Sequence, residues 1–409
     1  MRILLSEGSG LTSRQVAGRL GALGHEVELL SSSKLCLTRF TRHVRAVHHV
    51  PRFGLDPFGW LAAAERIAGE RKADLLFPTQ EQVTVLSAHR KQLRVSTIVP
   101  PFKSLAQVQD KISAFRTLTA IGAPQPQTFV IASPDELDKI TTYPVFVKRP
   151  VSTASSGVRR ASNARELEAA ARALGLQSGL GQSGLGQSGL LVQSQASGPL
   201  VMVQAVADQG RLIAHHACLR LREGVGGGAS LKQSIALPDL ADMLVRLVAA
   251  LGWHGGLSMD LIVAASGPVI IDVNPRLVEP GNAYAAGVDL VAAMLDLVGG
   301  ARPAQRPVGR PTVRTRQTLL AILGAAEQSG ARRVVLHEAF NAIFARAEYA
   351  GTIEELTPVA GDPIAAVPVL AALVACLVRP SLWRRFHAGA VGPYAVTPEA
   401  WDEILARAE

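Results

Sequence analysis

Apolar and polar positions alternate in short blocks at the start of the chain. Residues 2–5 and 27–30 are apolar runs of strand length, and residues 13–23 between them carry apolar side chains at helical spacing. A helix followed by a strand returns between residues 60 and 77. Strands that alternate with helices predict a Rossmann-like α/β domain over residues 1–100.

Polar residues follow the last of these strands, in the stretch Pro78-Thr79-Gln80-Glu81. Open α/β sheets bind ligands beyond the carboxyl ends of their strands. Glu81 is therefore a candidate contact for a substrate amine. The alternative role for Glu81 is to cap the helix that follows.

The middle of the chain predicts strands and helices of an α+β region. In the strand 143–148, Lys148 projects from the face that carries Phe146, and it ends the strand. A lysine at the end of a buried strand is a candidate phosphate ligand. The other expected elements are helices at 111–120, 163–174, 239–251 and 290–298, and strands at 200–206, 212–221 and 333–336.

Between Gln177 and Leu190 the pentad QSGLG repeats. Gly, Gln and Ser cannot bury enough apolar area to offset the entropy of ordering the chain. The repeat therefore predicts a disordered loop over residues 175–199 that carries no chemistry.

The stretch 257–282 predicts a two-stranded hairpin with its turn at Ser266-Gly267-Pro268. The residues Asp272, Asn274 and Arg276 alternate after the second strand, so their side chains share one face. Asp260 lies on the opposing strand and is expected to pair near Asp272.

Two carboxylates and an amide on one face form an oxygen site that suits Mg²⁺ on phosphate oxygens, with Mn²⁺ as a second candidate ion. Arg276 is then placed to hold a transferring phosphoryl group. The alternative is that Asp272 and Asn274 only end the strand and open a turn before Pro275.

Two loops rich in small residues lie near these candidates. In the loop 151–157, the backbone and hydroxyl groups of Ser155, Ser156 and Gly157 could fold over a triphosphate. The glycine-rich loop 224–230 precedes Lys232, and close approach of a phosphate or substrate would explain its glycines. A flexible hairpin tip and a mobile loop are the alternatives.

The order of these features resembles the ATP-grasp superfamily over about residues 1–300. The resemblance rests on Asp110-Lys111, on Lys148 with the loop after it, and on the D-V-N-P-R hairpin beginning at Asp272. The order of these motifs is similar to that in the ATP-binding domains of the large subunit of carbamoyl-phosphate synthase and of biotin carboxylase. The resemblance implies a Rossmann-like pre-ATP-grasp domain, a two-subdomain ATP-grasp fold and an additional α-rich C-terminal part.

The resemblance also implies roles for individual residues. It assigns the phosphates of ATP to Lys111 and Lys148, with Lys148 and Arg276 as catalytic groups. The remaining implied contacts are the lid residues Ser155, Ser156 and Gly157, the nucleotide ligand Lys232, the metal ligands Asp260, Asp272 and Asn274, the adenine hinge Gln204, Ala205 and Val206, and the ribose ligand Asp208. The family usually has an acidic and then an aromatic residue after the hinge Gln, where this chain has Ala205 and Val206.

The implied function is an ATP-dependent, ADP-forming ligase that activates a carboxylate as an acyl phosphate for attack by an amine or thiol. One alternative is an ATP-binding protein that has lost catalysis. The other is an NAD(P)-dependent oxidoreductase, based on Gly8-Ser9-Gly10, where Ser13 stands in place of the third glycine of the dinucleotide motif.

The expected organisation has four parts. Residues 101–200 and 201–300 would form the small and large ATP-grasp subdomains after the N-terminal domain, and residues 301–409 would be a linker and a C-terminal region. The apolar segment 363–378 is shorter than the ~20 residues that span a bilayer. We expect it to be a buried helix, with an interfacial helix as the alternative.

Composition narrows the class of partner. The net charge is +9, with 34 Arg against 8 Lys, but no basic cluster is interleaved with aromatic residues. This argues against a nucleic-acid partner and favours small-molecule substrates. The three cysteines are far apart, which argues against zinc and disulfides and fits a cytoplasmic protein. Oligomerisation stays open.

Overall fold

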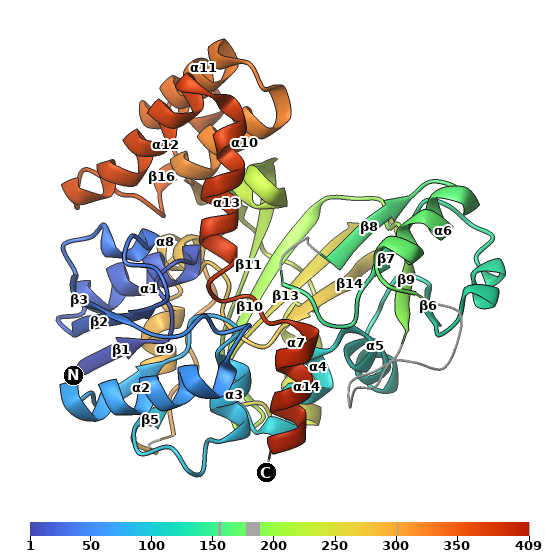
Figure 1. Cartoon of the computed structure of the whole chain (residues 1–409), viewed down its shortest axis with the longest axis horizontal. Coiled ribbons are helices and arrows are strands. Elements are labelled where there is room, and N and C mark those ends of the chain that lie inside the picture. Colours follow the sequence, from blue (N-terminus) through green and yellow to red (C-terminus); the bar gives the residue numbers. More distant parts are fainter. Residues whose placement is uncertain (154–156, 177–188, 301, 409) are drawn as a thin grey trace.

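A computed structural model describes residues 1–153, 157–176, 189–300 and 302–408 (Figure 1). Three sheets and a helical group make up the molecule. Figure 1 shows the N-terminal sheet on the left, a long central sheet, a small sheet on the right and the helical group at the top.

The N-terminal sheet is parallel throughout, with strand order β3-β2-β1-β4-β5. The predicted strands and helices are confirmed, whereas β3 and β5 were not predicted. The elements are β1 (Arg2–Leu5), α1 (Leu11–Ala22), β2 (Glu26–Ser31), β3 (Val44–His49), α2 (Pro57–Arg71), β4 (Leu75–Phe77), α3 (Val83–Ala88) and β5 (Ser96–Thr97).

The small sheet has strand order β6-β9-β7-β8, with antiparallel neighbours. Its central strand β9 lies inside the segment that was predicted to be a loop, so that prediction is wrong for residues 190–194. Residues 177–188 of the repeat lie outside the described residues. The elements are α4 (Phe102–Gln109), α5 (Lys111–Ala120), β6 (Thr128–Ile131), β7 (Val145–Lys148), β8 (Val158–Ala161), α6 (Ala164–Ala173) and β9 (Leu190–Ser194).

The central sheet has strand order β14-β13-β10-β11-β12-β15-β16. It extends past residue 300, because β15 and β16 join its edge. The helix α7 packs an apolar face on the sheet through Leu244, Leu247 and Val248. The elements are β10 (Leu200–Asp208), β11 (Arg211–Glu223), β12 (Ala229–Ser234), α7 (Leu240–Leu251), β13 (Gly255–Ala264), β14 (Gly267–Asn274), α8 (Gly281–Ala285), α9 (Leu290–Leu295), β15 (Arg314–Arg316) and β16 (Ile353–Glu354).

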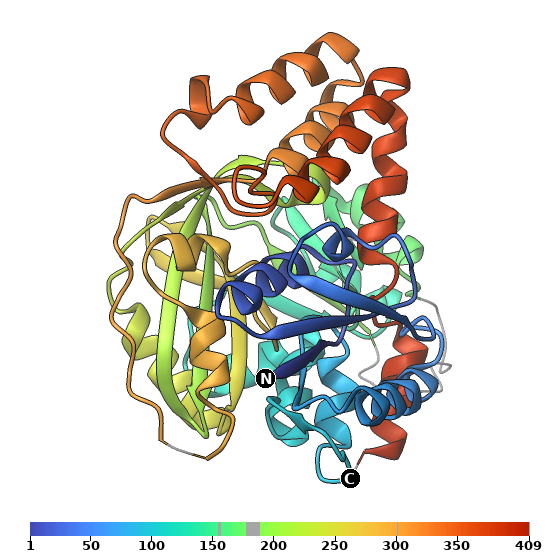
Figure 2. The same ribbon diagram turned by 90° about the vertical axis from the view of Figure 1, so that its left-hand side faces the viewer.

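The C-terminal helices stand above the sheets, and the last one returns to the N-terminal domain (Figure 2). Trp401 and Ile404 of α14 join the core of that domain. The predicted strand at 333–336 is wrong, because it lies in helix α11, which packs on α10; this packing overrides the strand preference of Val334-Val335. The helices are α10 (Thr318–Ser329), α11 (Arg332–Ile343), α12 (Ala366–Val378), α13 (Trp383–Val391) and α14 (Pro398–Arg407).

The apolar segment 363–378 is buried on one face only. In α12, Val369, Ala372 and Cys376 are buried, whereas Val374 and Val378 are 60% and 65% exposed. Among the described residues, none of the helices has the length and apolar character to cross a membrane. The expected burial is therefore confirmed for one face of this helix.

Candidate active site

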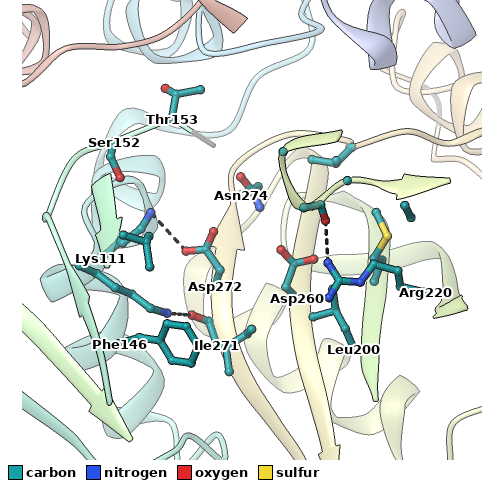
Figure 3. A pocket seen from close by; sticks show the side chains of 18 of the residues that line it. Lys111, Phe146, Ser152, Thr153, Leu200, Arg220, Asp260, Ile271, Asp272 and Asn274 are labelled. Carbon is teal, nitrogen blue, oxygen red and sulfur yellow. Dashed lines mark hydrogen bonds and ion pairs between the residues drawn. The ribbon is translucent and has the colours of Figure 1, made fainter. Parts of the chain in front are cut away.

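A cavity of about 830 Å³ lies where the small sheet, the central sheet and the N-terminal domain meet. This volume is within the range of roughly 300–1,000 Å³ of small-molecule sites. It is lined by Lys111, Lys148, Asp260, Asp272, Asn274, Arg276 and Glu81, all of them predicted site residues. Figure 3 shows the part of the cavity at the β13–β14 hairpin, which we call the hairpin end.

The two acidic residues of the hairpin end are cross-strand partners. Asp260 of β13 faces Asp272 of β14, as predicted from the sequence. The next pair joins Leu261 to Ile270, so Ile271 is an extra residue without a partner in the ladder. This β-bulge releases the Ile271 carbonyl from strand pairing.

Lys148 uses that released carbonyl. Its Nζ donates to the carbonyl oxygen of Ile271 at 2.7 Å and to Oε1 of Gln193 in β9 at 2.8 Å. The lysine therefore ties the small sheet to the hairpin. Burial lowers the pKa of Lys148 to about 8, partly offset by Asp272.

The carboxylates of the hairpin end are only partly neutralised. Lys111 lies 3.3 Å from Oδ1 of Asp272. Asp260 makes no ion pair within the described ranges; Arg220 lies beside it in Figure 3. Burial, and then the charge of Asp272, raise the pKa of Asp260 to about 7. Such a pair of carboxylates is suited to a divalent cation.

Arg276 lies further along the cavity, beyond Asn274. Its Nη2 donates to Oε1 of Glu81 at 2.9 Å, and both residues are buried. Ser258 donates to the Arg276 carbonyl at 2.8 Å, which fixes the chain after β14. The predicted substrate residue Glu81 thus orients the predicted catalytic arginine.

The loop after β7 contacts the cavity through Ser152 and Thr153. A Cβ on Gly157 would lie 2.3 Å from Cβ of Ser152, so only glycine fits at the base of this loop. The predicted lid residues Ser155 and Ser156 lie outside the described residues.

The second glycine-rich loop lines the opposite wall with Gly226, Gly227 and Gly228. Arg220 of β11 donates to the Gly227 carbonyl at 2.6 Å (Figure 3). Arg220 was not predicted as a site residue. The sequence feature that could have indicated Arg220 is its position in an apolar strand, where a charged side chain shares a face with Cys218 two residues earlier.

The predicted adenine-hinge residues of β10 do not line the cavity. Ala205 and Val206 are buried in apolar cores, and Gln204 donates to the Glu279 carbonyl at 3.2 Å. The cavity is lined instead by the end of β9 and the connection to β10, Gln193 to Ala196. The repeat next to β9 concealed this strand in the sequence.

Two other predicted nucleotide contacts do not line the cavity. Lys232 is 1% exposed and lies between Glu279, at 2.6 Å, and Glu355, at 2.7 Å. Asp208 pairs with Arg211 at 3.4 Å at the far end of β10. Glu279, which does line the cavity, was not predicted; it follows Arg276 by three residues and has φ = 53°.

The β1–α1 turn is occupied by a side chain of the protein itself. Oε1 of the buried Glu7 accepts hydrogen bonds from the Gly8 and Ser9 amides at 2.8 and 2.9 Å, and from the Ser31 hydroxyl at 2.9 Å. A dinucleotide pyrophosphate would need these amides. This contact argues against the oxidoreductase alternative.

Comparisons with known proteins agree with this architecture. Residues 108–280 match the family model of the ATP-grasp domain. No curated protein matches the sequence.

Solved structures with the same fold cover about three quarters of the chain. Biotin carboxylase from Campylobacter jejuni is 18% identical with a TM-score of 0.61, covering 76% of this chain and 74% of that one. N5-carboxyaminoimidazole ribonucleotide synthetase from Thermus thermophilus is 20% identical (TM-score 0.57; 76% and 81% covered). L-amino acid ligase from Bacillus licheniformis is 17% identical (TM-score 0.60; 77% and 79% covered). Residues 108–280 of this chain thus match the ATP-grasp domain, and the chain shares its fold with these solved enzymes.

Proposed function

We propose that this protein is an ATP-dependent ligase that activates a carboxylate as an acyl phosphate, releases ADP and joins the acyl group to an amine or thiol. The observation that carries the proposal is the hairpin end, where two lysines and two carboxylates converge with Arg276 next to them. A protein of similar structure, the biotin carboxylase domain of a 2-oxoglutarate carboxylase, was solved in complex with MgADP and bicarbonate.

Lys111 and Lys148 would bind the phosphates of ATP. Lys148 is held by Gln193 and by the Ile271 carbonyl, so its ammonium is oriented before a ligand arrives. The connection after Gln193 would receive the base, because its residues line the cavity beside Lys148.

The donor set fits Mg²⁺. Asp260 and Asp272 face each other, and burial, followed by the charge of Asp272, raises the pKa of Asp260. No cluster of three His, Cys, Asp or Glu side chains able to hold a metal occurs in the described chain, so the amide of Asn274 would complete the protein ligands. The bound ion would neutralise the phosphate oxygens as a Lewis acid.

In the proposed reaction, a carboxylate oxygen attacks the γ-phosphorus and the bond from this atom to the β–γ bridging oxygen breaks, so ADP leaves. The nucleophile then attacks the acyl carbon, phosphate leaves, and the nucleophile loses a proton to solvent. Arg276 would stabilise the phosphoryl charge during the first step, because Glu81 fixes its orientation.

The test is a screen of carboxylates, each paired with an amine or a thiol, for release of ADP and phosphate in the presence of Mg²⁺ and ATP. We expect ADP with at least one pair. Release of AMP and pyrophosphate would contradict the phosphoryl-transfer mechanism. ATP binding without turnover for any pair would favour the degenerate ATP-binding protein.

A further inference from the structure

A segment outside the ATP-grasp domain crosses the cavity. Residues 392–397, which we call the strap, connect the lower end of α13 in Figure 1 to α14 below it, near the middle of the molecule. Arg52 donates to the Gly392 carbonyl at 2.9 Å, and the Val396 amide donates to the Thr153 hydroxyl at 3.2 Å. The strap therefore joins the N-terminal domain to the loop after β7.

The strap is held closely along its length. A Cβ on Gly54 would lie 2.3 Å from the Ala395 carbonyl oxygen, and Thr397 donates to the Gly54 carbonyl at 3.1 Å. On the other side, His387 of α13 covers Gly226, where a Cβ would lie 2.3 Å from the imidazole. Three walls of the cavity are thus connected through the C-terminal region.

Tyr394 is the strap residue that lines the cavity. Its charged neighbours are Arg276, Glu81, Glu279 and Glu7, and burial with these carboxylates raises its pKa to about 12. The phenol is therefore neutral at pH 7. The Tyr394 hydroxyl has no hydrogen-bond partner among the described residues. It can therefore donate a hydrogen bond to a ligand and accept one from it.

The residues under the strap carry an excess of negative charge. Three buried carboxylates, Glu81, Glu279 and Glu355, share two cations, Arg276 and Lys232. Arg276 offers a site for an anionic group, and its buried Nε has no hydrogen-bond partner among the residues that the structure describes. Glu279 lines the cavity and has its carboxylate supported by Lys232. A ligand with both a carboxylate and an ammonium group matches this arrangement.

We propose that the strap end of the cavity, formed by Glu81, Arg276, Glu279 and Tyr394, binds an amino acid, and that the Tyr394 hydroxyl contacts it directly. The inference rests on the proposed function, because it names the class of carboxylate that the ligase would activate. The carboxylate of the amino acid lies toward Arg276 and its ammonium group toward Glu279, with the strap closing the site over both.

The test measures binding by calorimetry with Mg²⁺ and ADP present, so that no turnover is needed. The probes are pairs of compounds with the same carbon skeleton, with and without the amine: alanine and propionate, leucine and 4-methylpentanoate, phenylalanine and 3-phenylpropionate. We expect at least one amino acid to bind about 10-fold or more tightly than its partner, as a charged hydrogen bond would require. In Tyr394→Phe, we expect its Kd to rise about 3- to 10-fold with the Kd of ADP unchanged.

Tyr284→Phe is the matched control, because Tyr284 is half exposed, contacts Arg19 of α1 and is not among the residues that line the cavity. Equal binding of both members of every pair, absence of binding by all of them, or an unchanged amino acid Kd in Tyr394→Phe would overturn the inference. If an amino acid binds and its Kd rises in Tyr394→Phe, but no ADP is released in the screen, the result would support the inference and count against the proposed function.

Discussion

The two ends of the cavity differ in how their charges are balanced. At the strap end, Arg276 pairs with Glu81 at 2.9 Å, and Lys232 lies between two carboxylates at 2.6 and 2.7 Å. At the hairpin end, the carboxyl of Asp260 has a raised pKa and the ammonium of Lys148 a lowered one. The ion pairs of the strap end are formed before any ligand binds, whereas the charged groups of the hairpin end have perturbed pKa values.

This difference indicates which interactions serve stability and which serve binding. Buried ion pairs that hydrogen-bond each other fix the geometry of a site, and removal of one partner leaves an uncompensated charge. Groups with perturbed pKa values next to a cavity gain stabilisation only when a ligand supplies the missing charge. Substitutions in the ion pairs of the strap end should therefore lower the free energy of unfolding, whereas substitutions at the hairpin end should lower ligand affinity or turnover.

The largest effect is expected for Asp272→Asn, at the hairpin end. Because the amide lacks the charge that would hold the ion at the phosphoryl group, we expect turnover to fall by about 10³-fold, while the melting temperature stays within a few degrees. Steady-state ADP release and thermal melting measure the two effects. The control is Asp242→Asn, on the exposed face of α7; full activity of Asp272→Asn would refute the metal assignment.

At the strap end, Lys232→Met should act on stability. The substitution leaves Glu279 and Glu355 buried without a cation, and we expect the free energy of unfolding to fall by about 3–5 kcal/mol. Urea denaturation measures this loss. Lys91→Met, on an exposed turn, is the control. A loss no larger than in the control would show that the strap end is not held by this lysine.

Lys148→Met should weaken ATP binding. The fold-change in Kd should be smaller than the fold-change in turnover that Asp272→Asn causes. Loss of one charged hydrogen-bond donor to phosphate predicts a Kd about 10- to 100-fold higher. Calorimetry with ATP measures the change, with Lys91→Met again as the control. An unchanged Kd in a folded variant would remove Lys148 from the phosphate site.

The smallest effect is a dependence on pH at the hairpin end. Asp260 has a pKa of about 7 in the folded protein, above its ordinary value of 3.8, so the folded state holds a proton that the unfolded state has lost. Without ligand, the free energy of unfolding should fall as the pH rises from about 4 to about 7 and then level off. The affinity for MgADP should rise as the pH rises toward 7, because the Mg²⁺ ion would displace the proton from Asp260.

Urea denaturation and calorimetry between pH 5 and pH 8.5 test both trends. In Asp260→Asn, the free energy of unfolding should lose the part of its pH dependence that comes from this carboxyl. A slope identical to that of the wild-type protein would assign the titration to another group.

The sequence predicted the hairpin end because its information is local. The alternation of Asp272, Asn274 and Arg276, and the twelve residues that separate Asp260 from Asp272, determine which side chains meet once the turn forms. The parallel N-terminal sheet followed from periodicity in the same way.

At the strap end, Glu81 and Arg276 were predicted as site residues, but Glu279 and Tyr394 were not, because the residues of this end meet only through the tertiary fold. Lys232 is 123 residues from Glu355, and Tyr394 is 118 residues from Arg276. The strand β9 was missed for a different reason: its five residues adjoin the repeat, and composition outweighed the short apolar run.

The bulge at Ile271 has a consequence for how this site would respond to mutation. The acceptor that holds Lys148 is a main-chain carbonyl, which every substitution at position 271 retains. Side-chain scanning would therefore class the position as neutral for this contact. Removing the residue altogether would restore a regular ladder and leave Asp260 opposite Asp272, yet the lysine would lose its acceptor. Strand length, more than the side chain at this position, thus orients the ammonium of Lys148.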